Sequence, residues 1–287
     1  MSHLPPARIA ARILLNEAGF PAELGSMPQP VKALWVLGRL PQPAERRLAI
    51  VGARGASVVG CRLAREMSAR SARQGFAIIS GGALGIDAAA HRGALDAGGV
   101  TFAVLGCGVD VTYPDRHAAL YQDVAVAGGL LSEYPPGTPP RARQFPARNR
   151  IIVALAQTVL VVEAGLASGA LITARLAAKR GRALLAVPGT PGTDELIAAG
   201  TAQPIQDADA LASVLAGEPP PARPIPPRYA SLLAALRDGD AGVAELARRL
   251  SLGLAETLAL TAEAELDGWL CRRLGGALAS MEKTRGN

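Results

Sequence analysis

The chain alternates short apolar runs with segments in which apolar and polar residues recur at helical spacing. Apolar runs rich in β-branched residues are typical of strands that are buried on both faces. Such strands are expected at residues 48–52, 76–80, 101–106, 158–163 and 182–189. Amphipathic helices are expected near residues 58–75, 86–98, 115–129, 147–156 and 169–180. This alternation predicts a doubly wound α/β fold with a mainly parallel sheet.

The pattern changes on either side of this core, which we place at residues 46–216. Residues 1–45 hold a helix-like run at 7–18 and a Pro-rich connector, too little for a second independent core. Residues 217–227 carry six prolines in eleven positions, which predicts a semi-rigid linker. Beyond it, residues 228–287 show three helical patterns followed by CRRLGGALAS, which predict a small winged-helix-like domain.

Composition narrows the class of protein. Hydrophobic residues make up 49% of the 287 residues and charged residues 19%, as in a globular protein. The net charge of +6 favours anionic partners. Cys61, Cys107 and Cys271 are widely separated, so we expect reduced thiols in a cytoplasmic protein and no metal site. We expect no signal sequence and no membrane span, because Gln157 and Glu163 interrupt the best apolar run.

One segment gathers arginines around a single aromatic residue. The stretch RARQFPARNR contains, in order, Arg141, Arg143, Phe145, Arg148 and Arg150. Guanidinium groups bind phosphate and an aromatic ring stacks on an unpaired base, so these are the parts of a single-stranded nucleic-acid groove. Phe145 precedes Pro146, which favours an extended backbone and an outward-facing ring. The alternative is a solvated basic loop, with Phe145 in the core and Arg150 in a structural ion pair.

Glycine-rich segments follow several of the expected strands. They are GARGAS at 52–57, SGGALGID at 80–87, GCGVD at 106–110 and PGTPGT at 188–193. In a parallel sheet these strand ends meet at one edge, where glycines and helix N-termini favour a phosphate-bearing ligand. Arg54 adds a positive charge to the first loop. NAD is disfavoured, because Ser80 ends the second strand where a dinucleotide site would use Asp or Glu.

Acidic residues and one histidine offer weak candidates for catalysis. Asp87 and His91 lie four apart on one expected helix and could touch, but the sequence places no nucleophile beside them. Glu133 and Glu163 lie near strand ends. Either could be a general acid or base, or could instead bond to a neighbouring loop. No catalytic residue is therefore assigned.

The motifs, taken in order, resemble one family. IVGARGASVVG, SGGALGIDAAAHRGAL, TFAVLGCGVDVTYP, GGLLSEYPPGTPP, FPARNRIIVAL and VVEAGLASGALITARLA follow one another within residues 30–215. This series is similar to the DprA/Smf family of DNA-processing proteins of natural transformation. The resemblance implies an extended Rossmann-like core that binds and protects single-stranded DNA, loads the RecA recombinase and forms a homodimer. It also implies no enzymatic activity, no cofactor and no metal.

The basic cluster, the strand ends and the resemblance together give the predicted DNA-binding residues. They are Gly52, Arg54, Ser57, Ser80, Gly81, Gly82, Gly85, Arg141, Arg143, Phe145, Arg148, Asn149, Arg150, Ser168 and Gly169. Leu84 stands where the family commonly has Arg, which removes a cation from the expected phosphate path. The N-terminal helical domain of many members is expected to be missing, or reduced to a remnant in residues 1–45.

Two other functions compete with this prediction. Residues 188–195, PGTPGTDE, nearly match the PGGxGTxxE signature of nucleoside-monophosphate phosphoribohydrolases, a class of nucleotide-binding enzymes with a related fold. The catalytic Glu of that signature falls on Leu196; Glu195 is one residue early, which turns its carboxylate by about 100° around a helix. A winged-helix transcription factor is the other alternative. Its third helical pattern carries Glu256 and Glu263 but no Lys or Arg, whereas a helix that reads duplex DNA should be basic.

Overall fold

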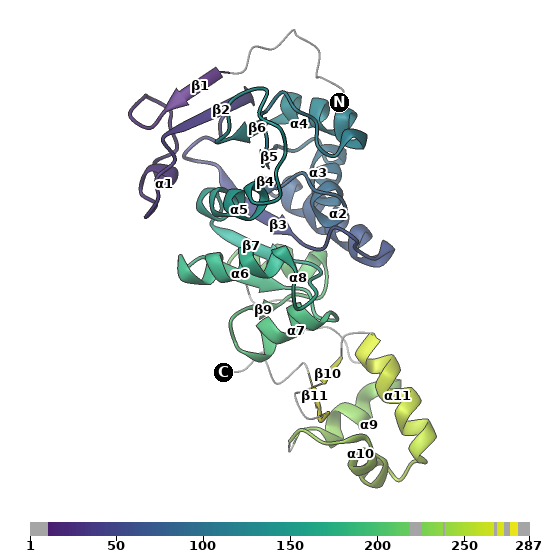
Figure 1. The fold of residues 1–287 in the computed structure, drawn as a ribbon. Helices are drawn as coiled ribbons and strands as arrows, with labels where there is room; N and C mark the ends of the chain where they lie inside the picture. The colour runs from purple at the N-terminus through teal and green to yellow at the C-terminus, as the bar shows by residue number, and fades with distance from the viewer. Residues whose placement is uncertain (1–10, 219–225, 238, 267–268, 273–275, 281–287) are drawn as a thin grey trace.

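A nine-stranded sheet forms the centre of the computed structural model (Figure 1). The structure describes residues 11–218, 226–237, 239–266, 269–272 and 276–280. The strand order is β1-β2-β6-β5-β4-β3-β7-β8-β9. The strands are β1 Ala11–Leu14, β2 Ala33–Gly38, β3 Arg46–Val51, β4 Phe76–Ser80, β5 Thr101–Leu105, β6 Gly129–Ser132, β7 Thr158–Val161, β8 Ala183–Ala186 and β9 Gln203–Pro204. From β6 to β9 all neighbours are parallel, while β1 and β2 pair antiparallel at one edge. The predicted α/β class with a mainly parallel sheet is confirmed.

Helices cover both faces of this sheet (Figure 1). One layer holds α1 Ala22–Gly25, α5 Gln144–Leu155, α6 Gly169–Lys179 and α7 Pro191–Ala198. The other layer holds α2 Val58–Arg73, α3 Ile86–Asp96, α4 Ala118–Ala127 and α8 Ala208–Leu215, with the short 3₁₀ turn Asp115–His117 before α4. Strand β3 shows why its run is apolar throughout: Ala49 packs into the first layer and Leu48 into the second.

The direction in which strands are added reverses beside β3. The chain runs from β3 through β4 and β5 to β6 on one side, then returns along α5 to place β7 on the other side of β3. The loops that leave β3 and β7 therefore separate in opposite directions and leave a crevice between them. In open parallel sheets this is the usual place for a ligand.

The N-terminal segment differs from the sequence prediction. The helix-like run expected at 7–18 is wrong in its described part, because residues 11–14 form β1. Strand β2 pairs with β6, and its residues Leu34 and Val36 are buried. The segment therefore extends the sheet instead of only connecting to it. Because β1 is largely exposed, its pairing with β2, rather than burial, explains why it is a strand.

Other boundaries move by a few residues. The helix expected over 115–129 ends at Ala127, and Gly129–Ser132 form β6 instead. Helix α5 begins at Gln144, three residues earlier than expected. Within the described residues, no helix is both long and apolar enough to cross a bilayer.

Three helices and a hairpin make up the C-terminal part. They are α9 Pro227–Ala235, α10 Val243–Leu250, α11 Leu254–Leu266 and the antiparallel pair β10 Leu270–Arg272 and β11 Leu278–Ser280. Their core includes Tyr229, Leu246 and Trp269. This is the element order expected of a winged helix, and that assignment stays a prediction, as does the division of the chain into domains. Most of the predicted linker and the side chain of Cys271 lie outside the described residues.

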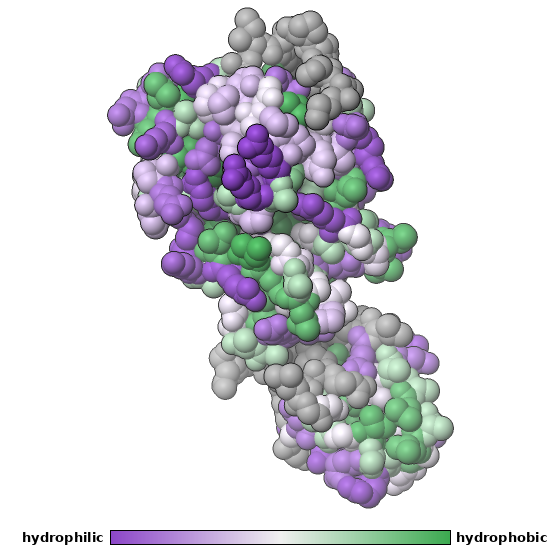
Figure 2. All heavy atoms as spheres, viewed as in Figure 1, coloured by the Kyte–Doolittle hydropathy of each residue, from purple (hydrophilic) through white to green (hydrophobic). Residues whose placement is uncertain are grey.

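Helix α11 turns apolar residues outward. Leu254 is 56% and Leu258 49% exposed, whereas Thr257 and Thr261 are fully buried. Both buried hydroxyls donate to main-chain carbonyls three or four residues earlier, which satisfies them locally. The green patch over α11 in Figure 2 is this outer face. Residues 254–266 contain no Lys or Arg, so the helix presents no cation to a DNA phosphate.

Candidate nucleic-acid interface

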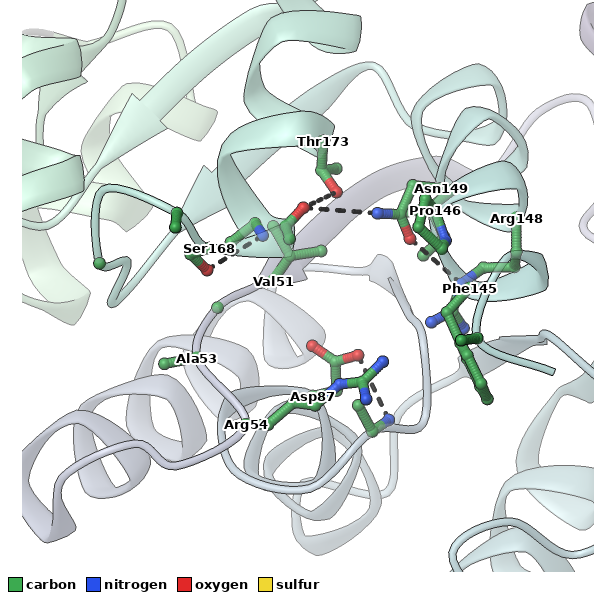
Figure 3. Close-up of a pocket in the computed structure, with 18 of the residues that line it drawn as sticks. Val51, Ala53, Arg54, Asp87, Phe145, Pro146, Arg148, Asn149, Ser168 and Thr173 are labelled. Carbon is green, nitrogen blue, oxygen red and sulfur yellow. Dashed lines mark hydrogen bonds between the residues drawn. The ribbon is translucent and has the colours of Figure 1, made fainter. Parts of the chain in front are cut away.

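A cavity of about 670 Å³ lies where β3 and β7 end. In Figure 3, Arg54 reaches it from the loop after β3, Phe145 and Asn149 come from α5, and Ser168 lies at the start of α6. A smaller hollow of about 60 Å³ adjoins the cavity. The two share the lining residues Arg54, Ala83, Tyr113, Phe145 and Arg148. The site therefore occupies the crevice that the strand order creates.

Close backbone packing fixes the loop that carries Arg54. A Cβ on Gly52 would lie 2.5 Å from Ile86 Cγ1, so a larger residue would not fit. The Ala53 amide donates to the Glu163 carbonyl at 2.8 Å, which joins this loop to the end of β7. Arg54 itself is exposed and has no ion-pair partner within the described part of the chain. Its guanidinium is therefore available to an anion.

Ser57, a predicted DNA contact, has a structural role at the start of α2. Its Oγ accepts the Gly60 amide at 2.9 Å and donates to the Glu163 carboxylate. The same carboxylate accepts the Ser57 amide at 2.9 Å. Of the two alternatives for Glu163, bonding to a neighbouring loop is thus confirmed. Neither side chain lines the cavity.

The loop after β4 is held by its own backbone geometry. Ser80 is fully buried and its Oγ donates to the Ile50 carbonyl at 2.6 Å, so this side chain has a structural role and its DNA contact stays a prediction. Gly82 and Gly85 have φ of 68° and 75°, in the left-handed region that favours glycine. A Cβ on Gly85 would lie 2.3 Å from the Ala53 carbonyl oxygen. The glycines of this loop therefore set its path.

Asp87 binds this loop from beneath. Its Oδ2 accepts the Gly81 amide at 3.1 Å and the Ala83 amide at 3.3 Å. Burial raises the pKa of Asp87. His91 bonds instead to Thr101, with 2.8 Å between Nδ1 and Oγ1, and burial lowers the pKa of His91 to about 3. The two side chains that the sequence places four apart thus have different partners, and they form no catalytic pair.

Arg148, a predicted DNA contact, is buried beneath the crevice, so the alternative of a solvated basic loop does not hold for this residue. The residue is 4% exposed, and its guanidinium donates to the carbonyls of Gly81 and Val104. Burial lowers the pKa of Arg148, and the nearby Asp87 carboxylate opposes that shift. A Cβ on Gly81 would lie 2.5 Å from Arg148 Nη2, so the missing side chain makes room for the guanidinium. The buried arginine thereby joins α5 to the loop after β4.

Arg150 forms a structural ion pair, which was the alternative to its predicted DNA contact. Its Nη2 lies 2.5 Å from Glu133 Oε1, and its Nη1 donates to the Gln29 carbonyl at 3.1 Å. The pair ties α5 to the end of β6 and to the segment before β2. Glu133 is therefore an ion-pair partner and not a free acid at the site.

Phe145 lies in a helix, so the predicted extended conformation is wrong. Helix α5 begins at Gln144, and Pro146 falls in its first turn, where the missing N–H breaks no helical hydrogen bond. The Phe145 ring is half-buried, with its centroid 5.4 Å from that of Tyr113 and 5.1 Å from Arg54 Cζ. A Cβ on Gly106 would lie 2.8 Å from Phe145 Cδ1. The ring is thus neither a core plug nor free in solvent.

Of the remaining predicted residues, Asn149, Ser168 and Gly169 line the cavity, whereas Arg141 and Arg143 do not. Arg141 and Arg143 are exposed in the turn before α5, and within the described ranges neither has an ion-pair partner. Asn149 Nδ2 lies 3.5 Å from the Gly169 carbonyl oxygen. Ser168 caps α6, since its Oγ accepts the Ala170 amide at 3.2 Å. Figure 3 shows Ser168 and Asn149 on different elements around the cavity.

Tyr113 lines both hollows and is not among the residues predicted from the sequence. Its position in the sequence could have indicated this role, because it is an aromatic residue just after the glycine-rich segment 106–110 in a chain with 3% aromatics. By contrast, Glu195 and Leu196, the positions tested for a phosphoribohydrolase, do not line the cavity. Within the described residues, no three His, Cys, Asp or Glu side chains gather in a way that could hold a metal ion.

A family model described as DNA recombination-mediator protein A matches residues 11–216. The chain belongs to this family. The match spans the whole nine-stranded sheet, including β1 and β2, and it confirms the resemblance drawn from the motifs. It stops before α9, so the C-terminal helices are not part of it.

Curated relatives extend this result. Protein Smf of Escherichia coli is 37% identical over 263 residues, which cover 85% of this chain and 70% of that protein. A Mycobacterium tuberculosis relative, whose name designates it a candidate DNA processing protein DprA, is 49% identical over 158 residues. That match covers 54% of this chain but 41% of the relative, so the chain spans less than half of its length.

Two solved structures share the fold, with 35% and 29% sequence identity to this chain. DNA processing protein A from Streptococcus pneumoniae has a TM-score of 0.66 at 35% identity, covering 69% of this chain and 72% of that one. The Helicobacter pylori protein has a TM-score of 0.66 at 29% identity, covering 74% of this chain and 97% of that one. The second structure is described as showing a single-stranded DNA binding mode of that protein.

Proposed function

We propose that this chain binds single-stranded DNA in the crevice between β3 and β7. The observation that carries the proposal is the exposed Arg54 guanidinium, which stands on the rim of a 670 Å³ cavity with no ion-pair partner in the described chain. An arginine that is not engaged by a carboxylate is free to bind phosphate. The single-stranded DNA binding mode described for the H. pylori relative supports the same assignment.

The surroundings of Arg54 favour a flexible strand over a duplex. Arg141 and Arg143 add two exposed cations beside α5, which suits a backbone that passes over the crevice. Tyr113 and Phe145 line the same cavity as Arg54 and offer ring surface there. Only an unpaired base can stack on such a ring, because the faces of paired bases are already covered by their neighbours.

Binding of fluorescent dT oligonucleotides and of duplex DNA over a salt titration tests the proposal. We expect tighter binding to single strands at every salt concentration. We also expect log affinity to fall with log salt by about 0.7 for each phosphate contact on a single strand. Equal affinity for both forms throughout the titration would contradict the proposal.

We further propose that the chain protects incoming DNA and loads the RecA recombinase during natural transformation, as its family membership suggests. Loading is tested by the start of RecA filament growth on DNA covered by single-strand-binding protein. The full chain should shorten the lag, and an unchanged lag at saturating protein would contradict the assignment.

A homodimer formed through the nine-stranded core is the third part of the proposal. Sedimentation of the full chain at micromolar concentration should give a dimer, whereas a monomer across the concentration range would contradict it. We assign the C-terminal helices an accessory role. The cation-free, apolar outer face of α11 is unsuited to phosphate and is more suited to contact with protein.

A further inference from the structure

Tyr113 stands apart from the other aromatic side chains of this protein. Among those the structure describes it is the most exposed, at 42%. Most large rings are buried because burial of their apolar surface stabilises the fold, so an exposed ring in a cavity wall indicates a binding role. Its position lies between the large cavity and the small hollow, both of which it lines.

The support behind Tyr113 holds its ring in place. The Phe145 ring lies behind it, with 5.4 Å between centroids and 34° between planes. Phe145 in turn packs against the backbone at Gly106. The Tyr113 carbonyl accepts a hydrogen bond at 2.7 Å from the hydroxyl of Tyr121, which is 1% exposed. The ring of Tyr113 therefore rests on the half-buried Phe145 ring, and its backbone is bonded to the buried Tyr121.

A cation completes this arrangement. Arg54 Cζ lies 5.1 Å from the centroid of the Phe145 ring, so Phe145 contacts both the guanidinium and the Tyr113 ring. An unpaired base carries an apolar face and is attached to a phosphate. A ring that can stack on the face, next to a guanidinium that can bind the phosphate, matches that ligand.

We propose that Tyr113 is the platform on which one unpaired base of the bound strand stacks. Phe145 supports the platform from behind, and Arg54 binds the neighbouring phosphate. The inference rests on the proposed binding of single-stranded DNA and deepens it, because it separates the base-contacting residue from the phosphate-contacting one. Stacking depends on the ring and not on base edges, so the platform accepts any base.

Substitution of Tyr113 in the full chain provides the test, with two ligands. The first ligand is a dT oligonucleotide and the second is an oligomer of the same length made only of abasic residues, which keeps the phosphates and removes the bases. Tyr113→Ala and Tyr113→Leu should weaken dT binding roughly 5- to 150-fold, as expected for loss of one stacking contact. Neither variant should change binding of the abasic oligomer, and Tyr113→Phe should keep most of the dT affinity.

Matched controls separate the possible outcomes. Val126→Ala removes an exposed apolar side chain from α4, away from the cavity walls, and should bind both ligands like the parent. Melting temperatures of all variants show whether the fold is kept, and Tyr113→Leu keeps apolar contact with Phe145 if the alanine variant is unstable. Tyr113 variants that bind dT like the parent, or that lose affinity for both ligands equally, would overturn the platform. A parent that binds dT no better than duplex would overturn the proposed function first.

Discussion

Replacement of Arg148 by methionine isolates the interaction between the buried charges of Arg148 and Asp87 beneath the crevice. The change keeps much of the side-chain volume but leaves the Asp87 carboxylate buried without its cation, and it leaves the Gly81 and Val104 carbonyls without their donor. Removal of one partner from a buried pair costs about 3–5 kcal/mol, because the other charge stays desolvated. In a fold of this size that corresponds to a fall in melting temperature of about 6–20 °C.

The pH dependence of the stability lost in Arg148→Met identifies the cause of that loss. Burial already raises the pKa of Asp87, and Arg148 opposes that rise, so Arg148→Met should raise the pKa further. When the folded-state pKa of a carboxyl lies above its unfolded value, the folded state binds the proton more tightly and stability falls as pH rises through that window. The stability deficit of the variant should therefore be largest near pH 8 and should shrink towards pH 5.

Thermal unfolding of parent and variants across this pH range is the assay. Arg92→Met serves as the control, because Arg92 and Asp123 form an exposed pair at 2.7 Å whose loss should cost less than about 1 kcal/mol. The double variant Asp87→Asn with Arg148→Met should lose less stability than Arg148→Met alone, since no charge is then left unpaired. The stability deficit of Arg148→Met should exceed that of Arg92→Met and should shrink towards acid pH. A deficit no larger than that of Arg92→Met, or one that grows towards acid pH, would refute the role assigned to Arg148 and Asp87. A salt slope of DNA binding reduced by about 0.7 would instead restore Arg148 as a phosphate contact.

Three further predictions concern the rest of the site. Arg150→Met should lower the melting temperature modestly and leave the salt slope of dT binding unchanged, since the arginine is held in an ion pair; a lower slope would show that it touches phosphate. Gly85→Ala should destabilise the fold by more than Gly98→Ala: both have positive φ, but only at Gly85 would the Cβ meet backbone, and equal melting temperatures would count against the loop packing. Arg141→Ala combined with Arg143→Ala should reduce the salt slope by up to about 1.4, measured by anisotropy, if both bind phosphate.

The centre of the fold could be read from the sequence because its strands are buried on both faces. The runs at 48–52 and 76–80 are apolar at nearly every position, and β3 and β4 occupy them. The edge strand β1 has no such apolar run. The four residues of β1 are mostly exposed and depend on pairing with β2, which is a tertiary contact that a local pattern does not contain.

The helical period in the basic segment indicates which of its residues are buried. Gln144, Arg148, Ile151, Ile152 and Leu155 recur at spacings of three and four and are all buried on one face of α5. Extending the period back from the isoleucines therefore places Arg148 inward. The rule that a residue before proline is extended misled the prediction for Phe145, because a proline in the first turn of a helix is tolerated.

Partners of the charged residues could not be predicted from sequence spacing. Arg150 and Glu133 are 17 residues apart, and Ser57 and Glu163 are 106 residues apart, yet each pair is in contact. Arg54 and Arg148 look equivalent in the sequence, but one is exposed at the rim and the other is buried below it. The packing of α5 against the strand ends buries Arg148, in agreement with the helical period of that segment.

The salt dependence of dT binding by Arg54→Ala tests the central claim most directly. Arg12→Ala is the matched control, because Arg12 is an exposed arginine on β1, the outermost strand on one side of the sheet and several strands away from β3, and its loss changes the net charge equally. Arg54→Ala should bind more weakly than the parent, with a slope of log affinity against log salt lower by about 0.7, while Arg12→Ala keeps the parent's slope. A folded Arg54→Ala protein with the affinity and slope of the Arg12→Ala protein would show that the DNA does not pass through this crevice.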